Sequence, residues 1–164
     1  MSKLLELSTQ VVQAAVDAGL TVATAESLTA GLVSAAIADV PGASGVLQGG
    51  VVAYRNSVKE KLLNVPGELL ASAGSVDGGV AVAMAGGVRE ACGADIGVST
   101  TGVAGPDAHD GKSVGTVFIG VAGAMGSRSF EYAFEGNRSD IRSRACEAAL
   151  ERLLAEVRSV LYQR

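Results

Sequence analysis

The sequence of 164 residues has few aromatic residues, prolines and cysteines. It has no tryptophan, and aromatic residues make up 4% of a chain that is 48% hydrophobic, so its core must consist mainly of Ala, Val, Leu and Ile. Three prolines beside 22 glycines indicate tight turns and close backbone approaches rather than disorder. The length fits a single domain, residues 1–164, that can bury a core without disulfides or metals.

The sequence also lacks an excess of basic residues and any apolar run long enough to span a membrane. Its formal net charge of −4 argues against general binding to nucleic acid or to an anionic membrane, because both need a basic surface. Cys92 and Cys146 have no paired spacing, and we interpret them as reduced, buried thiols. We therefore expect a cytoplasmic protein without nucleic-acid or membrane partners.

The hydrophobic pattern changes between helical and strand periods along the chain. It predicts helices that end at Gly19, that cover about 29–38, 57–63 and 77–91, and that start at Pro66 and at Asn137. It predicts strands at 21–25, 46–54, 95–103, 114–122 and 127–134, of which the last two form an antiparallel hairpin. This order predicts an α/β fold, a three-layer α/β/α sandwich with a mixed β-sheet.

The stretch VATAESLTAG, residues 22–31, places Ser27 on the turn between a predicted strand and a predicted helix. Serine is a favoured helix N-cap, which contributes about 1 kcal/mol. A strand-to-helix turn also lifts a hydroxyl to the rim of a sheet, where it can act as a nucleophile. The second interpretation needs a group that takes the serine's proton, and the candidates are His109, Lys59, Tyr54, Glu26 and the nearby aspartates.

The candidate bases differ in their sequence context. His109 is the only histidine and lies in a hydrophilic loop, where we expect an exposed side chain. Asp107, His109 and Asp110 lack a specific ligand spacing, so we expect no metal site. Lys59 becomes a base if burial lowers its pKa, and Tyr54 ends the strand before it, but on spacing alone the KEK run is more typical of a solvated helix face.

Three polar or glycine-containing stretches fall where predicted strands end. They are AESLTAG at 25–31, AYRNSVKEK at 53–61 and TTGVAGPDAHDGK at 100–112. Ligands of open α/β sheets bind in crevices at strand ends, so we expect the three stretches to converge on one pocket.

Five segments carry a resemblance to a known family: AESLTAG, GGVVAYRNSVKEKLLNV, TTGVAGPD, SVGTVFIGV and GNRSDIR. In this order, and over nearly the whole chain, they resemble the CinA C-terminal domain family, whose characterised members include nicotinamide-nucleotide amidohydrolase. The resemblance implies hydrolysis of the carboxamide of nicotinamide mononucleotide to nicotinate mononucleotide and ammonia. It implies that Ser27 is the nucleophile and that Tyr54 and Lys59 assist it.

The resemblance also implies which residues contact the substrate. They belong to the ES.T.G, TG.AGP and NR..IR motifs, and they are Thr29, Gly102, Ala104, Gly105, Arg138 and Arg142. Arg142 is the first candidate for the substrate's phosphate and Arg138 the second. The resemblance implies a stand-alone unit and a homo-oligomer, and we expect no cofactor.

The chain departs from the family pattern at positions beside the implied reactive groups. Ala30 stands where a second glycine is usual, Ser113 stands where proline is usual, and GSVD occupies 74–77. These departures concern substrate fit more than reaction type. A non-catalytic nucleotide-binding or regulatory module, in which Ser27 is only a cap, is the alternative function.

Overall fold

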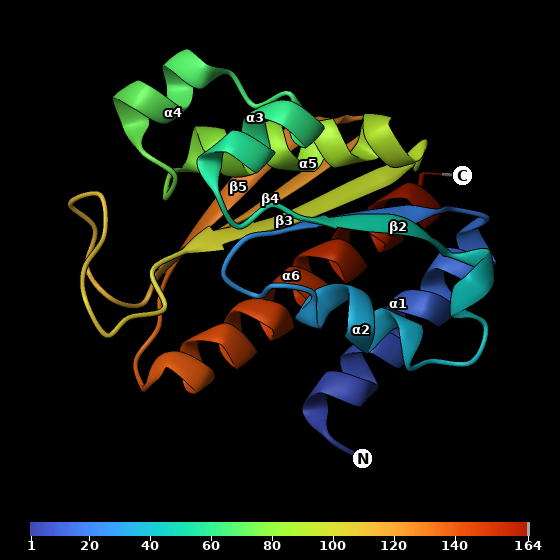
Figure 1. The fold of residues 1–164 in the computed structure, drawn as a ribbon. Helices are drawn as coiled ribbons and strands as arrows, with labels where there is room; N and C mark the ends of the chain where they lie inside the picture. The colour runs from blue at the N-terminus through green and yellow to red at the C-terminus, as the bar shows by residue number, and fades with distance from the viewer. Residues whose placement is uncertain (164) are drawn as a thin grey trace.

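The computed structural model describes residues 1–163, which form a five-stranded sheet between two layers of helices (Figure 1). The strands are β1 Val22–Glu26, β2 Leu47–Val52, β3 Ile96–Gly102, β4 Thr116–Gly123 and β5 Gly126–Ala133. Their order in the sheet is β2-β1-β3-β4-β5, with β1 parallel to β2 and β3, while the pairs β3–β4 and β4–β5 are antiparallel. The predicted three-layer sandwich with a mixed sheet is confirmed.

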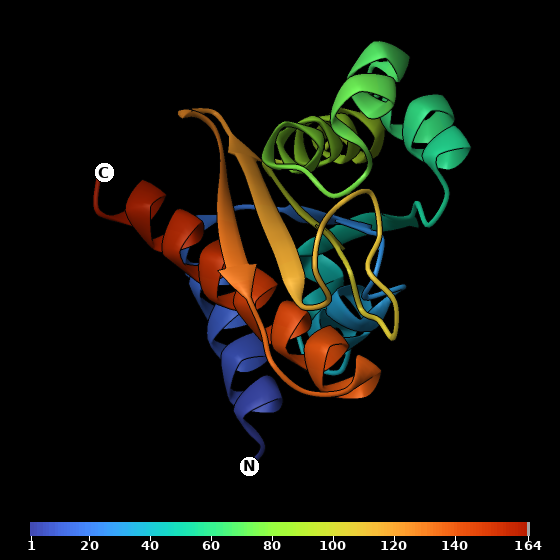
Figure 2. The ribbon, with the colours of Figure 1, turned by 90° about the vertical axis from the view of Figure 1, so that its left-hand side faces the viewer.

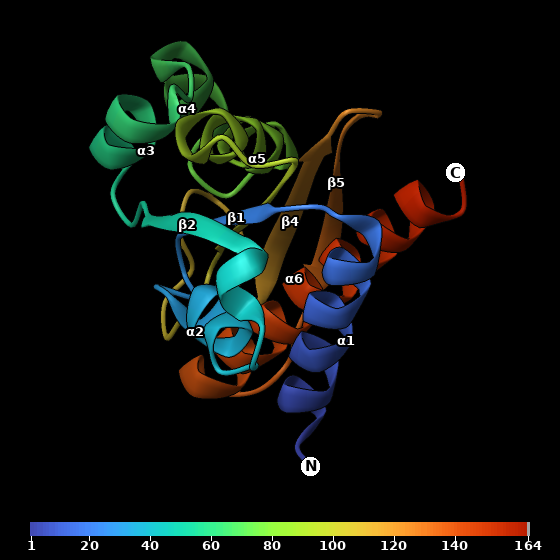
Figure 3. The same cartoon turned by 90° about the vertical axis from the view of Figure 1, so that its right-hand side faces the viewer.

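Two sets of helices cover the two faces of the sheet. One face carries α1 Lys3–Ala18, α2 Leu32–Ala38 and α6 Arg138–Leu161, and the other carries α3 Asn56–Leu63, α4 Gly67–Ala73 and α5 Gly78–Cys92. The view in Figure 3 shows α1 beside α6 below the sheet and α3 to α5 above it. No helix within residues 1–163 is both long enough and apolar enough to cross a membrane.

The core packs closely because its residues are small. Helix α5 lies directly on the sheet, where Gly97 of β3 and Gly120 of β4 face its backbone. A Cβ at either glycine would lie 2.1–2.2 Å from a carbonyl oxygen of α5, so no other residue fits there without moving the helix. Helix α5 and the sheet are therefore too close at these two positions for large side chains, which is consistent with the low aromatic content of the chain.

The second helix begins later than the sequence pattern predicts. It starts at Leu32, and its N-cap residue is Gly31, with a φ of 104° and no side-chain cap. Residues 27–31 form a turn in which Ala30 also has a positive φ of 47°. The prediction that Ser27 could be the N-cap of this helix is therefore wrong, because the chain makes a full turn between the strand and the helix.

The parallel strands position the candidate site. The carboxyl ends of β1, β2 and β3 lie at the same edge of the sheet. The chain leaves β1 toward α2 on one face and leaves β2 toward α3 on the other, while the segment after β3, residues 103–115, crosses to β4. Figure 2 views the molecule from this edge, with the segment between β3 and β4 in front. The neighbouring strands β1 and β3 are followed by strands on opposite sides, β2 and β4, so their connections run apart along the sheet. At such a point an open α/β sheet has the crevice in which it binds ligands.

Candidate active site

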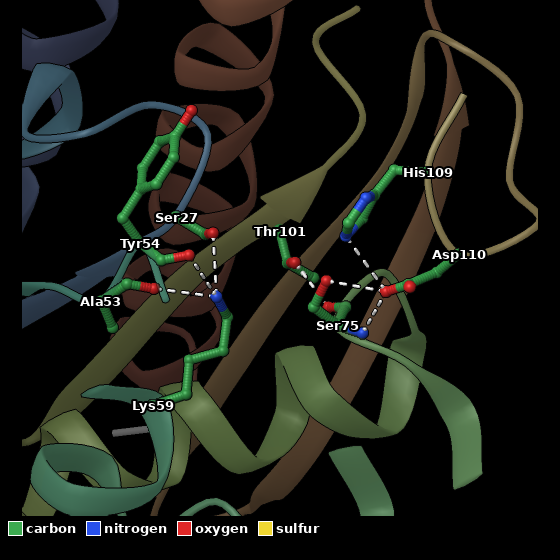
Figure 4. Close-up of polar contacts among 8 residues, drawn as sticks. All are labelled: Ser27, Ala53, Tyr54, Lys59, Ser75, Thr101, His109 and Asp110. Atoms are coloured by element: carbon green, nitrogen blue, oxygen red, sulfur yellow. Dashed lines mark hydrogen bonds and ion pairs between the residues drawn. The ribbon is translucent and has the colours of Figure 1, made fainter. Parts of the chain in front are cut away.

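Lys59 contacts Ser27 directly, although 32 residues separate them in the chain. The side chain of Lys59 rises from α3 and is 1% exposed. Its Nζ donates hydrogen bonds to Ser27 Oγ at 3.0 Å, to the backbone oxygen of Ala53 at 2.8 Å and to that of Tyr54 at 3.1 Å (Figure 4). All three donors of the ammonium group are therefore used, two of them by the backbone that follows β2.

The surroundings of Lys59 favour its neutral form. Within residues 1–163 no carboxylate forms an ion pair with it. Burial lowers the pKa of Lys59 from 10.5 to about 8, because the charged form loses its hydration. In the neutral amine, two N–H groups can keep their bonds to the two carbonyls, and the lone pair then points at the hydroxyl of Ser27.

The turn after β1 is held by a buried carboxylate. Glu26 is 1% exposed, and its Oε1 accepts hydrogen bonds from Thr29 Oγ1 at 2.7 Å and from the backbone N–H of Val33 at 2.8 Å. Its Oε2 accepts from the backbone N–H and from the hydroxyl of Ser34, both at 3.1 Å. Glu26 therefore faces the start of α2 and has no hydrogen bond to Ser27, which does not favour its role as the base.

Thr29 supports the same turn from inside the protein. Its side chain is completely buried, and besides the bond to Glu26 its hydroxyl lies 2.8 Å from the hydroxyl of Thr100. The backbone N–H of Ser27 donates to the backbone oxygen of Thr100 at 3.0 Å, which continues the pairing of β1 with β3. Thr29 is thus placed on the interior side of Ser27.

A cavity of about 340 Å³ opens in front of Ser27. It is lined by Ser27, Leu28, Tyr54, Ser75, residues 101–109 and Arg138. The lining includes Gly102, Ala104 and Gly105, three of the residues expected to contact the substrate. The three stretches at the strand ends do converge on one pocket, as the sequence predicts.

Tyr54 and Arg138 meet at the cavity. The side chain of Arg138 donates from Nη1 to the backbone oxygen of Gly105 at 2.5 Å and from Nη2 to the hydroxyl of Tyr54 at 2.9 Å. Tyr54 is 54% exposed, and its ring points away from Lys59 (Figure 4). The backbone of Tyr54 therefore holds Lys59, while its hydroxyl belongs to a separate contact with Arg138.

Arg142 lies outside the cavity lining. Its Nε donates to the backbone oxygen of Leu28 at 2.9 Å and its Nη2 to that of Thr29 at 3.3 Å, and both contacts are partly buried. One helical turn separates it from Arg138, and that turn places Arg138 at the cavity and Arg142 beneath the turn that carries Ser27. The expected order of the two arginines as phosphate ligands is thus not supported by their positions, which favour Arg138.

The segment after β3 has its own anchor. Asp110 Oδ2 accepts from the backbone N–H of Ser75 at 2.9 Å and from its hydroxyl at 3.1 Å, and it pairs with His109 Nε2 at 3.3 Å. The backbone N–H of Ser75 lowers the pKa of Asp110 by stabilising its charged form. His109 is exposed and bonds Asp110 rather than Ser27. Within residues 1–163 no group of three or more His, Cys, Asp or Glu side chains is arranged to hold a metal ion.

The sequence did not single out Leu28, Ser75 and Thr100 as functional candidates, although the structure places them at the site. Leu28 contributes through its backbone, which leaves no signal in residue type. Thr100 contributes through its backbone oxygen and its hydroxyl, which both accept from the N–H of Ser27, but a threonine within a strand is no signal by itself. Ser75 had one signal, because it lies in the GSVD departure at 74–77. Gly74, with a φ of 77°, lies so close to Asp110 that a Cβ there would be 2.8 Å from the carboxylate. That departure therefore fits the anchor of the segment after β3.

The fold and the site define an α/β/α protein with a buried serine–lysine contact at the point where the connections of its parallel strands diverge. Residues 4–157 match the family model of the CinA C-terminal domain. The chain belongs to this family.

Relatives and solved structures agree with the family. A protein of Desulforamulus reducens is 51% identical over 139 residues, which are 85% of this chain and 34% of that protein. A CinA-like protein of Geotalea uraniireducens is 46% identical over 127 residues, 77% of this chain and 30% of that protein. The chain thus spans about a third of the length of the curated relatives that it matches.

The structural likeness extends over nearly the whole chain. The crystal structure of the competence/damage inducible protein CihA from Agrobacterium tumefaciens has a TM-score of 0.90 at 33% identity and covers 94% of this chain and 96% of its own. A CinA superfamily protein from Klebsiella pneumoniae has a TM-score of 0.91 at 28% identity, with coverage of 95% and 98%.

Proposed function

We propose that this chain hydrolyses the carboxamide of nicotinamide mononucleotide, with Ser27 as the nucleophile and Lys59 as the base. The observation that carries the proposal is the 3.0 Å contact between Lys59 Nζ and Ser27 Oγ, in a site where burial lowers the pKa of the lysine to about 8. The substrate is the one that the family resemblance implies, and a cavity of about 340 Å³ is within the usual range for small-ligand sites.

The first half of the reaction would form an acyl-enzyme. Neutral Lys59 takes the hydroxyl proton of Ser27 while Oγ bonds to the carboxamide carbon, and the carbonyl π electrons move to its oxygen. The carbonyl then re-forms, the C–N bond breaks, and the nitrogen leaves as ammonia with the proton that Lys59 had taken. An ester between Ser27 and the nicotinoyl group remains, and Lys59 is neutral again.

The second half would release the acid. Lys59 takes a proton from water, the water oxygen bonds to the ester carbon, and a second tetrahedral intermediate forms. Its collapse breaks the bond to Oγ, which recovers the proton from Lys59. The overall balance is carboxamide plus water to carboxylate plus ammonium. The negative oxygen of both intermediates needs a donor, and we assign this role to the backbone N–H of Leu28, because Leu28 follows the nucleophile and lines the cavity.

The remaining residues of the cavity suit the substrate's phosphate. Arg138 uses two of its five N–H donors in the contacts described, so others are available to an anion. The backbone N–H groups of Ala104 and Gly105 make no hydrogen bond within residues 1–163 and can add to the same subsite. In this proposal Arg138 is the phosphate ligand, whereas Thr29 and Arg142 act from behind the turn. A homo-oligomer remains an expectation that rests on the resemblance, and a cytoplasmic location remains one that rests on the sequence composition.

The test is ammonia release from nicotinamide mononucleotide by the purified protein, without added metal. We expect sustained turnover that Ser27→Ala abolishes, with the folded state retained because the Ser27 side chain caps no helix. Binding of the nucleotide without turnover would favour the non-catalytic module instead. A folded Ser27→Ala protein with normal turnover would rule out this nucleophile.

Tyr54→Phe separates direct proton transfer from a relay through the tyrosine hydroxyl. The substitution keeps the backbone oxygen that holds Lys59 and removes only the hydroxyl that bonds Arg138. The direct contact of Lys59 with Ser27 therefore leads us to expect a small change in kcat, about threefold or less, and a moderate rise in KM. A loss of kcat as large as that of Lys59 variants would instead favour the relay.

A further inference from the structure

In the turn after β1, the backbone N–H of Leu28 is free, and hydrogen bonds hold both peptide groups that flank Leu28. The N–H of Leu28 makes no hydrogen bond with any of residues 1–163, and Leu28 lines the cavity beside Ser27. The peptide group that carries this N–H is fixed through its other end, because the backbone oxygen of Ser27 accepts from the N–H of Ala30 at 3.1 Å. A donor with a fixed direction and no partner among the described residues suits the charge that develops on a reacting carbonyl.

The peptide group on the other side of Leu28 is fixed by Arg142. The backbone oxygen of Leu28 accepts from Arg142 Nε at 2.9 Å, and within residues 1–163 it has no other hydrogen-bond partner. Arg142 Nη2 also bonds the backbone oxygen of Thr29 at 3.3 Å. Because a peptide unit is planar, holding each carbonyl fixes the unit to which it belongs. Arg142 thus sets the orientation of Leu28 from its C-terminal side.

The charge of Arg142 adds to this effect. No carboxylate within residues 1–163 forms an ion pair with Arg142, so its positive charge is not neutralised by a side chain. The guanidinium lies partly buried against the turn that carries Ser27, where water screens it less than at an exposed position. A fixed positive charge near a developing oxyanion lowers the energy of the transition state more than that of the substrate.

We infer that Arg142 is a positioning residue for the transition state, holding the Leu28 N–H in the direction of the oxyanion, and is not a ligand of the substrate's phosphate. The inference rests on the proposed function, because it assigns Arg142 a part in amide hydrolysis at Ser27. It gives the two arginines of α6 different tasks, since Arg138 lies in the cavity and Arg142 bonds the turn behind it.

The experiment compares kinetic constants of three arginine variants on nicotinamide mononucleotide and on the phosphate-free riboside. Arg142→Gln should lower kcat about 10- to 100-fold on both substrates with KM within threefold, because the lost interaction acts on the transition state. Arg138→Gln should mainly raise KM for the nucleotide and spare the riboside. Arg144→Gln, an exposed position of the same helix, removes the same charge and should leave both constants unchanged.

Arg142→Lys protects the test against a variant that fails to fold. Lysine keeps the charge and can reach one of the two carbonyls, so we expect kcat to lie between those of the wild type and Arg142→Gln at an unchanged melting temperature. A rise in KM confined to the nucleotide, or an unchanged kcat in folded Arg142→Gln, would overturn the inference while the proposed function stands. A wild-type protein that releases ammonia from neither substrate would overturn the proposed function, and the inference with it.

Discussion

The two segments that face each other across the cavity are held in very different ways. The turn at 27–31 is buried at its first three residues, and Glu26, Thr100, Arg142 and Lys59 bond it from several sides. The segment at 103–115 is exposed from residue 106 to residue 111, and its side-chain anchors are Asp110 on Ser75 and Arg138 on the backbone oxygen of Gly105. One wall of the cavity is therefore more buried and held by more side-chain bonds than the other, and we call them the rigid wall and the lightly fastened wall.

This difference matches the two tasks that the proposed function requires. A nucleophile and an oxyanion donor must stay within a fraction of an ångström of their working geometry, which needs packing and hydrogen bonds behind them. A substrate-binding loop tolerates more freedom, because it can adjust to the ligand. We therefore expect substitutions behind the turn to lower kcat and substitutions in the loop to change KM.

Removing Lys59, the proposed base, should cause the largest loss of activity. We expect Lys59→Met to lower kcat/KM by about 10²–10⁴-fold, since general-base catalysis contributes that much. In the wild type, activity should rise with pH through an apparent pKa near 8, well below that of an ordinary lysine. A pH–rate profile of both proteins checks this. Full activity of Lys59→Met beside an inactive His109→Ala would show that the base is the histidine.

The same variant has a signature in stability. Between about pH 8 and 10.5 the unfolded chain binds the Lys59 proton and the folded protein does not, so the free energy of unfolding should rise with pH in this window. Lys59→Met lacks that rise. Urea denaturation at several pH values between 7.5 and 10.5 measures the difference, and parallel curves for the two proteins would contradict the lowered pKa.

The second largest effect should come from Glu26→Gln. In the wild type, both carboxylate oxygens accept hydrogen bonds, for example from the backbone N–H and the hydroxyl of Ser34. The amide of glutamine has the same size, but its NH₂ group is a donor and would face these donors. Leaving buried donors unsatisfied costs about 1–3 kcal/mol, so we expect a loss of about 2 kcal/mol in the free energy of unfolding together with a lower kcat. Urea denaturation checks the first and steady-state kinetics the second. Glu131→Gln, an exposed position on β5, is the matched control and should change neither.

Asp110→Asn tests the lightly fastened wall. Asparagine tolerates the positive φ of 51° at this position and can still accept from Ser75, so we expect a stability loss of about 0.5 kcal/mol, a change in KM and an unchanged kcat. Because the folded-state pKa of Asp110 is lowered, the stability advantage of the wild type should be present at neutral pH and should disappear as the folded protein takes up that proton in acid. A kcat loss as large as that of Glu26→Gln would erase the distinction between the two walls.

Ala30→Gly should have the smallest effect and the opposite sign. Ala30 has a φ of 47°, a region that costs an L-residue roughly 1 kcal/mol and costs glycine nothing, so we expect the free energy of unfolding to rise by about 0.5 kcal/mol. Ala35→Gly, at an exposed position inside α2, should instead destabilise by about 0.5–1 kcal/mol. Thermal unfolding of the two variants compares them, and a loss at both positions would contradict the strain at Ala30.

Periodic segments of this fold could be predicted well from the sequence, and the turn after β1 could not. The longer helices α5 and α6 and the strands of the hairpin lie close to their predicted ranges, because their apolar spacing is regular. The start of α2 was misplaced by about three residues. Nothing in Leu28 to Ala30 signals a left-handed residue, since alanine is a strong helix former, and only Gly31 hints at the break.

The contacts within the site depend on tertiary structure in the same way. The contact of Lys59 with Ser27 requires β2 to pair with β1, which local patterns do not specify. Arg138 and Arg142 share a helix face by their spacing, but which of them reaches the cavity depends on how α6 lies against a turn more than 110 residues earlier in the chain. The sequence nominates these residues, but the partner of each depends on the fold.

The orientation of Lys59 by two backbone oxygens has a consequence for how this site can change over generations. In a serine–histidine–aspartate triad, the residue that orients the base is itself a side chain, and a single codon change can remove it. Here the oxygens of Ala53 and Tyr54 are present whatever side chains occupy those positions. Under the proposed function, the catalytic pair therefore depends on the two codons of Ser27 and Lys59, and the alignment of the base is inherited with the backbone. The side chains of Ala53, in the core, and of Tyr54, on Arg138, are constrained for other reasons.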